Sequence, residues 1–267
     1  METKRLKNIA ILILLLLNVF LLLLLGYHEL VGLHTEQEAM AELKALFATE
    51  ELTLTLEAST PTKSLTPLTL TRKMESEASI AAFLLGGAAE MRSEGGGIYS
   101  YSTAIGTVQF RSGGGFDTVR FARKVENAED FVRQFCAKFG YEDISGTVRN
   151  GSGSITAMQY VARVPILGCG VTFTFEKENL VSVAGAHIDL GDAQTEREEP
   201  LNGVSVLARF FDYRNREGIV CREVSGLWCV YQLQSGASQP RLLPVWIVET
   251  DTYAYLVDGF TGKVVRK

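Results

Sequence analysis

The chain has 267 residues, of which 46% are hydrophobic and 21% charged, and its formal net charge is −5. These fractions provide enough apolar residues for a folded core and exclude an intrinsically disordered protein, while the acidic excess argues against a broad nucleic-acid-binding surface. With only three histidines (His28, His34 and His187), the chain also lacks the ligands for a histidine-rich metal site.

The first predicted element is a membrane anchor. Residues 9–25 contain a single polar side chain, Asn18, in an otherwise apolar run. A helix needs about 20 apolar residues to cross a bilayer, and about 17 is the lower limit, so we predict a single transmembrane helix over residues 9–27. Basic residues precede this run and glutamates follow it, so the positive-inside rule places residues 1–8 in the cytoplasm and the rest outside the cell. A cleaved signal peptide is the alternative, but no small-residue cleavage site follows the run.

The amide of Asn18 allows two interpretations. In hydrocarbon, a side-chain amide gains about 0.6–2 kcal/mol from a hydrogen bond to another helix. It is also satisfied when it bonds to the backbone of its own helix. The sequence alone leaves both interpretations open.

Residues 28–49 are predicted to form a juxtamembrane helix that continues the anchor outward as a stalk. Met40, Leu43 and Phe47 recur in it at helical spacing. This spacing predicts one apolar stripe along the helix.

Residues 50–124 are predicted to combine a helix with hairpins. The alternating segment 52–56 predicts a strand with one buried face. The segment 74–91 is rich in alanine and leucine and predicts a helix, weakened near its middle by Gly86 and the glycine that follows it. Glycines interrupt the alternating and aromatic-rich segments over 98–122, which predicts a meander of hairpins.

Residues 125–190 begin with the clearest soluble helix. Asn127 is a good N-cap, Gly140 is a natural C-terminal stop, and the phenylalanines between them share one face of the helix. Four strands are predicted to follow this helix.

The same order returns near the C-terminus. The acidic and polar segment 191–200 is predicted to be a linker. Residues 201–267 then begin with a helix over 202–216 that stops at Gly218, and antiparallel strands follow it. We therefore predict an α+β fold in which a single N-terminal transmembrane helix is followed by an ectodomain of repeated helix-plus-antiparallel-sheet units.

Within the second unit, Ser225 and Gly226 are predicted to form a two-residue hairpin loop. Side chains alternate along each strand, so Cys221 and Cys229 would then point to opposite faces of the hairpin. We predict no disulfide between these two cysteines.

The sequence contains no motif typical of catalysis or cofactor binding. Its glycine-rich segments lack the Walker spacing, it has no G-x-S-x-G sequence, and its four cysteines form no C-x-x-C pair. His187 is the one histidine in a region predicted to fold, and its apolar strand favours a structural role. We therefore predict no catalytic, cofactor-binding or metal-binding residues and no enzymatic activity.

Two stretches of the chain resemble known families. The basic head and the apolar run with its element Leu17-Asn18-Val19-Phe20-Leu21 resemble the start of YycI-type proteins. The stretches 244–248 (PVWIV) and 255–264 (YLVDGFTGKV) resemble the closing strands of PepSY-like modules. Length and the overall order of elements also agree with a YycI-type protein.

The resemblance implies a function. YycI-type proteins are accessory regulators, not enzymes, of a two-component system that governs cell-wall metabolism in Gram-positive bacteria. It implies a sensor histidine kinase and a YycH-like companion as partners in the lipid bilayer, with Asn18 and Phe20 as partner-binding residues. It also implies that 125–190 and 201–267 are two PepSY-like units. No cofactor and no nucleic acid is expected.

Two other functions compete with this interpretation. One is an extracellular PepSY-like module that binds or inhibits a secreted peptidase. The other is a membrane-anchored cell-wall hydrolase that uses aspartate or glutamate, which would need a deep pocket with two carboxylates of shifted pKa.

Overall fold

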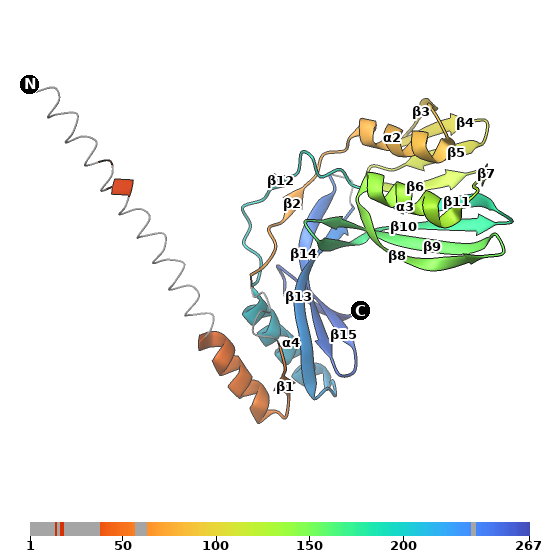
Figure 1. Ribbon diagram of the computed structural model, residues 1–267. Helices are drawn as coiled ribbons and strands as arrows, with labels where there is room; N and C mark the ends of the chain where they lie inside the picture. Colours follow the sequence, from red (N-terminus) through yellow and green to blue (C-terminus); the bar gives the residue numbers. More distant parts are fainter. Residues whose placement is uncertain (1–13, 15–16, 19–37, 57–62, 236–238) are drawn as a thin grey trace, which may run out of the picture.

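A computed structural model describes residues 14, 17–18, 38–56, 63–235 and 239–267 (Figure 1). The predicted cytoplasmic head and most of the predicted anchor, including Phe20, lie outside the described residues. Leu14, Leu17 and Asn18 are helical and exposed. Within the described ranges, no helix has both the length and the apolar character needed to cross a membrane.

Strands dominate the described part of the chain. The helices are a segment over 38–49, α2 (Met74–Leu85), α3 (Ala128–Phe139) and α4 (Gly203–Glu217). The strands are β1 (Thr53–Leu54), β2 (Leu68–Thr69), β3 (Glu90–Gly95), β4 (Ile98–Thr103), β5 (Gly106–Phe110), β6 (Gly115–Val119), β7 (Arg123–Lys124), β8 (Tyr141–Arg149), β9 (Ser152–Val161), β10 (Val164–Glu176), β11 (Asn179–Ala186), β12 (Gln194–Thr195), β13 (Glu223–Gln234), β14 (Arg241–Thr250), β15 (Ala254–Asp258) and β16 (Val264–Arg266).

The predicted fold class is wrong, because the strands do not form separate repeated units behind an N-terminal transmembrane helix. They belong to one mixed, 16-stranded sheet with the central order β12-β2-β14-β13-β10-β11-β6-β5-β4-β3. Two short strands from the N-terminal part enter the C-terminal end of this sheet, where β1 pairs in parallel with β13 and β2 pairs with β14. Such pairing between distant segments leaves no periodic signal in the sequence, which explains the wrong prediction.

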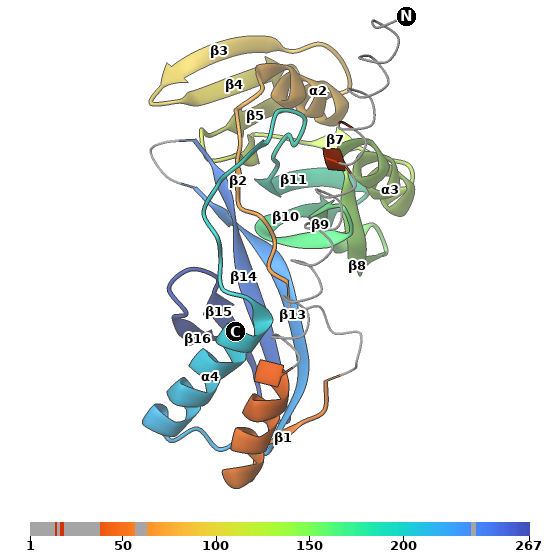
Figure 2. The same ribbon diagram turned by 90° about the vertical axis from the view of Figure 1, so that its left-hand side faces the viewer.

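The sheet bends into two lobes (Figures 1 and 2). We call the part built from α2, α3 and β3–β11 the α3 lobe, and the part built from the helix over 38–49, α4, β1 and β13–β16 the α4 lobe. A parallel pairing of β10 with β13, at Ile166 with Tyr231 and Leu167 with Gln232, joins them. The predicted linker, 191–200, contributes β12 to the sheet beside β2.

The helix predicted to start at an Asn127 cap and the helix predicted over 202–216 both form, and the structure adds an N-cap at Asn202. The Asn127 side chain accepts a hydrogen bond from the Asp130 backbone N–H at 3.0 Å, and the Asn202 side chain accepts one from Ser205 at 3.0 Å. Gly140 and Gly218 end these helices in the left-handed conformation, with φ of 73° and 64°. These bonds satisfy backbone groups that a helix end otherwise leaves unpaired.

The helix predicted over 74–91 is shorter than expected. It stops at Leu85 because Gly86 adopts a left-handed conformation with φ of 80° and caps it. The last residues of the predicted helix instead open strand β3, which pairs with β4. Gly86 therefore ends the helix and does not merely weaken it.

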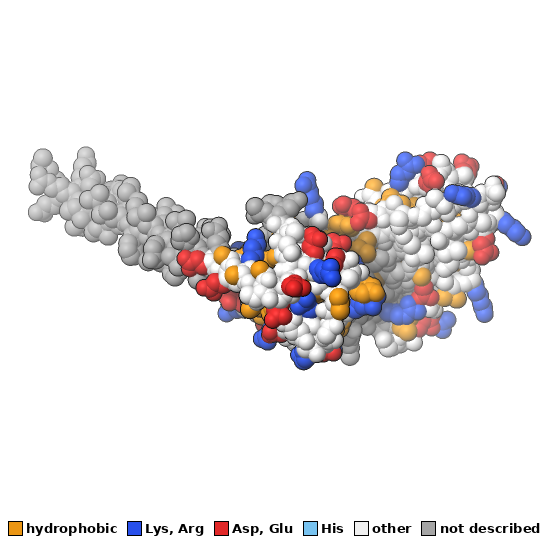
Figure 3. All heavy atoms as spheres, turned by 90° about the horizontal axis from the view of Figure 1, so that it is seen from below, with side chains coloured by type: hydrophobic (Ala, Val, Ile, Leu, Met, Phe, Trp, Pro, Cys, Tyr) orange, Lys and Arg blue, Asp and Glu red, His pale blue; other side chains and the backbone are white. Residues whose placement is uncertain are grey.

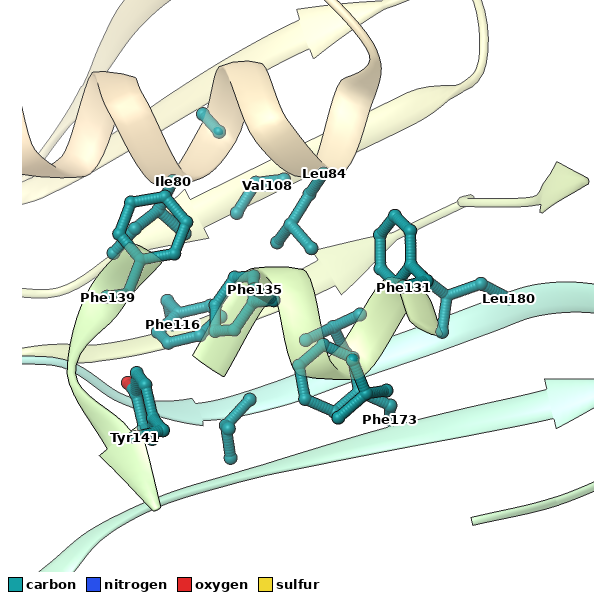
Figure 4. Close-up of a cluster of buried hydrophobic side chains, with 14 of the residues drawn as sticks. Ile80, Leu84, Val108, Phe116, Phe131, Phe135, Phe139, Tyr141, Phe173 and Leu180 are labelled. Atoms are coloured by element: carbon teal, nitrogen blue, oxygen red, sulfur yellow. The ribbon is translucent and has the colours of Figure 1, made fainter. Parts of the chain in front are cut away.

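The α3 lobe has an aromatic core between its helices and its sheet (Figure 4). Phe131, Phe135 and Phe139 point from α3 into this core, as the helical spacing predicted. Phe135 packs edge-on against Phe173 of β10, with ring centroids 5.1 Å apart. Phe83 of α2 contacts all three α3 phenylalanines, so the two helices share one core.

The predicted hairpin at Ser225 and Gly226 is also wrong. Strand β13 runs through both residues and only shifts its register against β14 there, as a β-bulge does. A Cβ on Gly226 would lie 2.4 Å from the Trp228 ring, so this glycine makes room for a side chain and does not form a turn. Cys221 and Cys229, like the other two cysteines, are free thiols.

Candidate functional site

Of the two predicted partner-binding residues, only Asn18 lies within the described residues. Asn18 lies in a short described helical stretch, exposed, and Phe20 is outside the described residues. The first continuous described range is 38–56. The helix over 38–49 is therefore the first element of the chain whose contacts with the folded lobes can be described.

This helix is built into the core of the α4 lobe. Its predicted stripe is confirmed, because Leu43 and Phe47 are buried and Met40 packs beside them. The Phe47 ring is fully buried and stacks on Phe211 of α4, with centroids 4.8 Å apart and planes 15° from parallel. Glu38 and Glu42 of this helix are exposed. Acidic side chains are also visible on the surface of the molecule in Figure 3.

The backbone strengthens this attachment. Immediately after the helix, β1 pairs in parallel with the start of β13, and the Thr53 N–H donates to the Arg222 carbonyl at 2.8 Å. The Arg214 guanidinium of α4 donates to the Glu50 carbonyl at 3.4 Å and to the Cys221 carbonyl at 3.2 Å. Side-chain packing and backbone hydrogen bonds therefore both hold the helix over 38–49 against the rest of the α4 lobe.

A second candidate site is a small cavity where the two lobes meet. It lies between the start of α2, the segment after β11 and the turn over 112–114, and its volume is about 30 Å³. That volume accommodates one or two water molecules and no larger ligand. Its polar lining includes Ser76, His187 and Asp189, the residue types of a serine hydrolase, so their geometry decides what the site can do.

The histidine of this cavity is neutral. His187 Nε2 lies 3.2 Å from the Ser76 hydroxyl, and its Nδ1 is buried without a hydrogen-bond partner in the described part of the chain. The ring packs against Phe139 and Tyr141, with centroids 6.1 and 5.9 Å away. Burial lowers the pKa of His187 to about 4, against a smaller opposing effect of Asp189.

The carboxylate is on the wrong side for a catalytic triad. Burial alone would raise the pKa of Asp189, but the Gly191 N–H, the Lys73 ammonium and Ser76 lower it overall. Lys73 Nζ lies 3.4 Å from Asp189 and 2.9 Å from Asp192. In a triad the carboxylate holds the histidine through Nδ1, whereas Asp189 acts near the serine. The arrangement stabilises a neutral histidine at the lobe junction.

A buried ion pair forms another wall of the cavity. Arg72 donates to both Glu77 carboxylate oxygens, at 2.6 and 3.0 Å, and both side chains are largely buried. The same guanidinium lies 4.8 Å from the centre of the Tyr99 ring. These contacts fix the start of α2 against the sheet.

Sequence reasoning found only part of this cluster. It singled out His187 and favoured a structural role, but it did not connect the histidine with Ser76, which lies 111 positions away in the chain. The one local signal was the pair Arg72 and Lys73 directly before a predicted helix. Basic residues at a helix start oppose the helix dipole, which indicates that they serve a tertiary contact.

Comparisons with known proteins give little further guidance. No family model matches the chain, and no curated protein sequence does. Among solved structures, the Bacillus megaterium YpeB C-terminal domain superposes on 74% of this chain and 98% of its own with a TM-score of 0.34 and 10% sequence identity. At this TM-score and identity the similarity is too distant to assign a fold family or a function to the chain.

Proposed function

We propose that this protein is a non-catalytic accessory regulator of a sensor histidine kinase, held at the cell membrane by its N-terminal segment with the folded lobes outside. In this proposal it acts through contacts within the membrane and outside it, with Asn18 and Phe20 as contact residues and a YycH-like companion as second partner. The resemblance of the N-terminal and C-terminal stretches to YycI-type and PepSY-like proteins suggests this role.

One structural observation carries the proposal. The helix over 38–49 is the segment closest in the chain to the proposed anchor, and Phe47 locks it into the α4 lobe through its stack on Phe211. A regulator that transmits a state of its extracellular body to partners in the membrane needs such a stiff connection. A flexible tether would transmit no displacement.

The test is to loosen this connection. Phe47→Ala removes a fully buried ring, which costs about 3–5 kcal/mol of packing at the site. We expect kinase output, measured with a reporter gene, to change while the amount of protein in the membrane stays comparable. Leu46→Ala is the matched control, because Leu46 is the neighbouring side chain and is 47% exposed.

Two outcomes would contradict the proposal. If Phe47→Ala and Leu46→Ala both leave kinase output unchanged, the helix does not transmit regulation. If a fragment that starts at residue 38 restores regulation in cells that lack the full chain, membrane attachment is not needed. The alternative of an extracellular module that binds a secreted peptidase would then be favoured, and inhibition by this fragment would be measured directly.

A further inference from the structure

A groove of about 460 Å³ runs along the α4 lobe between α4 and the turn that joins β15 to β16. Arg209 and Arg216 line it from the helix and Lys263 lines it from the turn, with Asp212 as the one acidic residue. The chain as a whole carries a net charge of −5. The groove therefore concentrates positive charge on an otherwise acidic protein.

The basic side chains of the groove are available to a ligand. Within the described residues, neither the Arg209 guanidinium nor the Lys263 ammonium lies within ion-pair distance of a carboxylate, but the charge of Lys263 helps to lower the pKa of Asp258 in the same turn. Arg216 pairs with its exposed neighbour Glu217, at 3.0 Å, and its guanidinium lies 5.8 Å from the centre of the Tyr213 ring; exposed ion pairs of this kind contribute little. Arg214 differs, because its guanidinium bonds to backbone carbonyls inside the lobe.

The spacing of these charges fits an elongated ligand. Arg209, Tyr213 and Arg216 are four and three residues apart, so they lie on one face of α4. At 1.5 Å per residue, the two arginine positions are about 10 Å apart along the helix axis. A single small anion cannot contact both ends of the groove equally, whereas a chain with repeated negative charges can.

The turn that forms the other wall is preformed. The Asp258 carboxylate accepts hydrogen bonds from the Phe260 and Thr261 N–H groups, at 2.9 and 2.7 Å. Gly262 adopts φ of 69°, and a Cβ there would lie 2.9 Å from the Arg209 stem. The glycine thus lets the arginine stem pass along the turn, and the charged groups are held without a ligand.

We propose that this groove binds an extended polyanion whose negative charges are phosphates. A guanidinium presents its N–H donors as a fork that matches phosphate oxygens, and Tyr213 lines the groove between the two arginine positions on the helix. An acidic peptide is the competing ligand, because Val264 in the other wall belongs to β16, which among the described strands pairs only with β15 and leaves one strand edge open. This inference does not depend on the regulatory proposal.

The test uses the full chain in non-ionic detergent with fluorescently labelled inorganic polyphosphate as the probe. We expect binding in fluorescence anisotropy, and we expect the double variant Arg209→Gln/Lys263→Gln to weaken it by about 10- to 100-fold. The association constant for polyphosphate should also depend less steeply on salt concentration in this double variant. The magnitude of the slope of its logarithm against log salt concentration should decrease by about one to two, because two phosphate contacts are lost. Arg133→Gln, an exposed arginine on α3, is the matched control and should bind like the unmodified chain.

Three results would overturn the inference. The first is no binding of polyphosphate at physiological salt, and the second is equal weakening by Arg133→Gln, which would indicate non-specific attraction. The third is groove-dependent binding of phosphatidylglycerol vesicles or of polyglutamate with no preference for polyphosphate. That third result would assign the groove to a membrane or to an acidic protein segment. All the substituted side chains are exposed, and circular dichroism would verify that each variant is folded.

Discussion

The α3 lobe and the α4 lobe share a local plan. In each, an asparagine starts the central helix and a glycine ends it. In each, a second helix packs on the first through a phenylalanine: Phe83 of α2 on the α3 rings, and Phe47 on Phe211. Both helix pairs cover one face of their part of the sheet.

The lobes differ on the opposite face of the sheet. In the α3 lobe, neighbouring strands β8 to β11 place Ser145, Thr156, Thr172 and Ala184 side by side, and all four are exposed. This face is well hydrated and has little apolar area to bury. It needs no partner to be stable in water.

In the α4 lobe, the corresponding row is apolar. Trp228, Ile247, Leu256 and Val265 are register neighbours across β13 to β16. Trp228 and Val265 at the two ends of the row are 37% and 43% exposed, whereas Ile247 between them is 3% exposed and belongs to a small buried cluster. The same helix-on-sheet plan thus carries two different outer surfaces, and the α4 lobe combines the apolar row, the basic groove and the attachment of the N-terminal segment. The two lobes therefore differ in outer surface, although they share their helix layer.

The largest expected effects test whether the two lobes fold as one unit. Phe135→Ala and Phe210→Ala each remove a fully buried ring, one per lobe, and should lower the free energy of unfolding by about 3–5 kcal/mol. Both tryptophans, Trp228 and Trp246, lie in the α4 lobe, so tryptophan fluorescence reports on that lobe alone. We expect Phe135→Ala to shift the urea transition seen by fluorescence.

The reason for this expectation is the core that both lobes share. Ile166 and Ala186 from the α3 lobe pack with Tyr231 and Leu242 from the α4 lobe in one buried cluster. The Tyr231 hydroxyl also donates to the Thr66 carbonyl at 2.8 Å. If Phe135→Ala shifts the transition seen by far-ultraviolet circular dichroism but leaves the fluorescence transition in place, the lobes unfold independently.

An intermediate effect is expected from acid, and it should start in the α3 lobe. The pKa of His187 is about 4 in the folded protein and near 6.5 in an unfolded chain. The unfolded state therefore binds this proton first as the pH falls. The contribution of neutral His187 to the free energy of unfolding is therefore fully present above pH 6.5. It is lost as the pH falls from 6.5 to 4, by up to about 3 kcal/mol.

The variant His187→Gln isolates this contribution. An amide keeps a donor and an acceptor near Ser76 but does not titrate in this range. We expect the free energy of unfolding of the variant, measured by urea denaturation, to fall less between pH 6.5 and 4 than that of the unmodified chain. Identical pH profiles would show that protonation of carboxylates, not of the histidine at the lobe junction, governs acid unfolding.

Local signals in the sequence predicted the helices well and the sheet poorly. The caps at Asn127 and Asn202 depend on residues within a few positions of one another, so the sequence contains all the information needed. Gly226 shows the opposite case. Next to a serine it is typical of a turn, but the Trp228 ring that occupies the space beside it reaches there only in the folded sheet.

The candidate site follows the same rule. His187 stood out because the chain has so few histidines, yet its partner Ser76 comes from a helix that is distant in the sequence. The pairing of β1 with β13 likewise joins segments about 170 residues apart. Which segments meet is decided by packing of the whole chain, and no periodicity or spacing within a segment specifies it.

The smallest expected effects compare the two lobes at a matched position. Asn127→Ala and Asn202→Ala each remove a side-chain oxygen that accepts a backbone N–H, and each should cost about 1 kcal/mol in the free energy of unfolding. Asn→Asp at the same positions keeps the acceptor and adds a negative charge at the positive end of the helix dipole, so it should preserve stability at neutral pH. Urea denaturation of all four variants measures both effects.

Because a cap acts on its own helix end, the alanine costs should agree between the lobes despite their different outer faces. If Asn202→Ala lowers the free energy of unfolding several-fold more than Asn127→Ala does, the start of α4 also supports the contact between the helices and the C-terminal strands. The two lobes would then resemble each other in their helix caps but not in what the caps support.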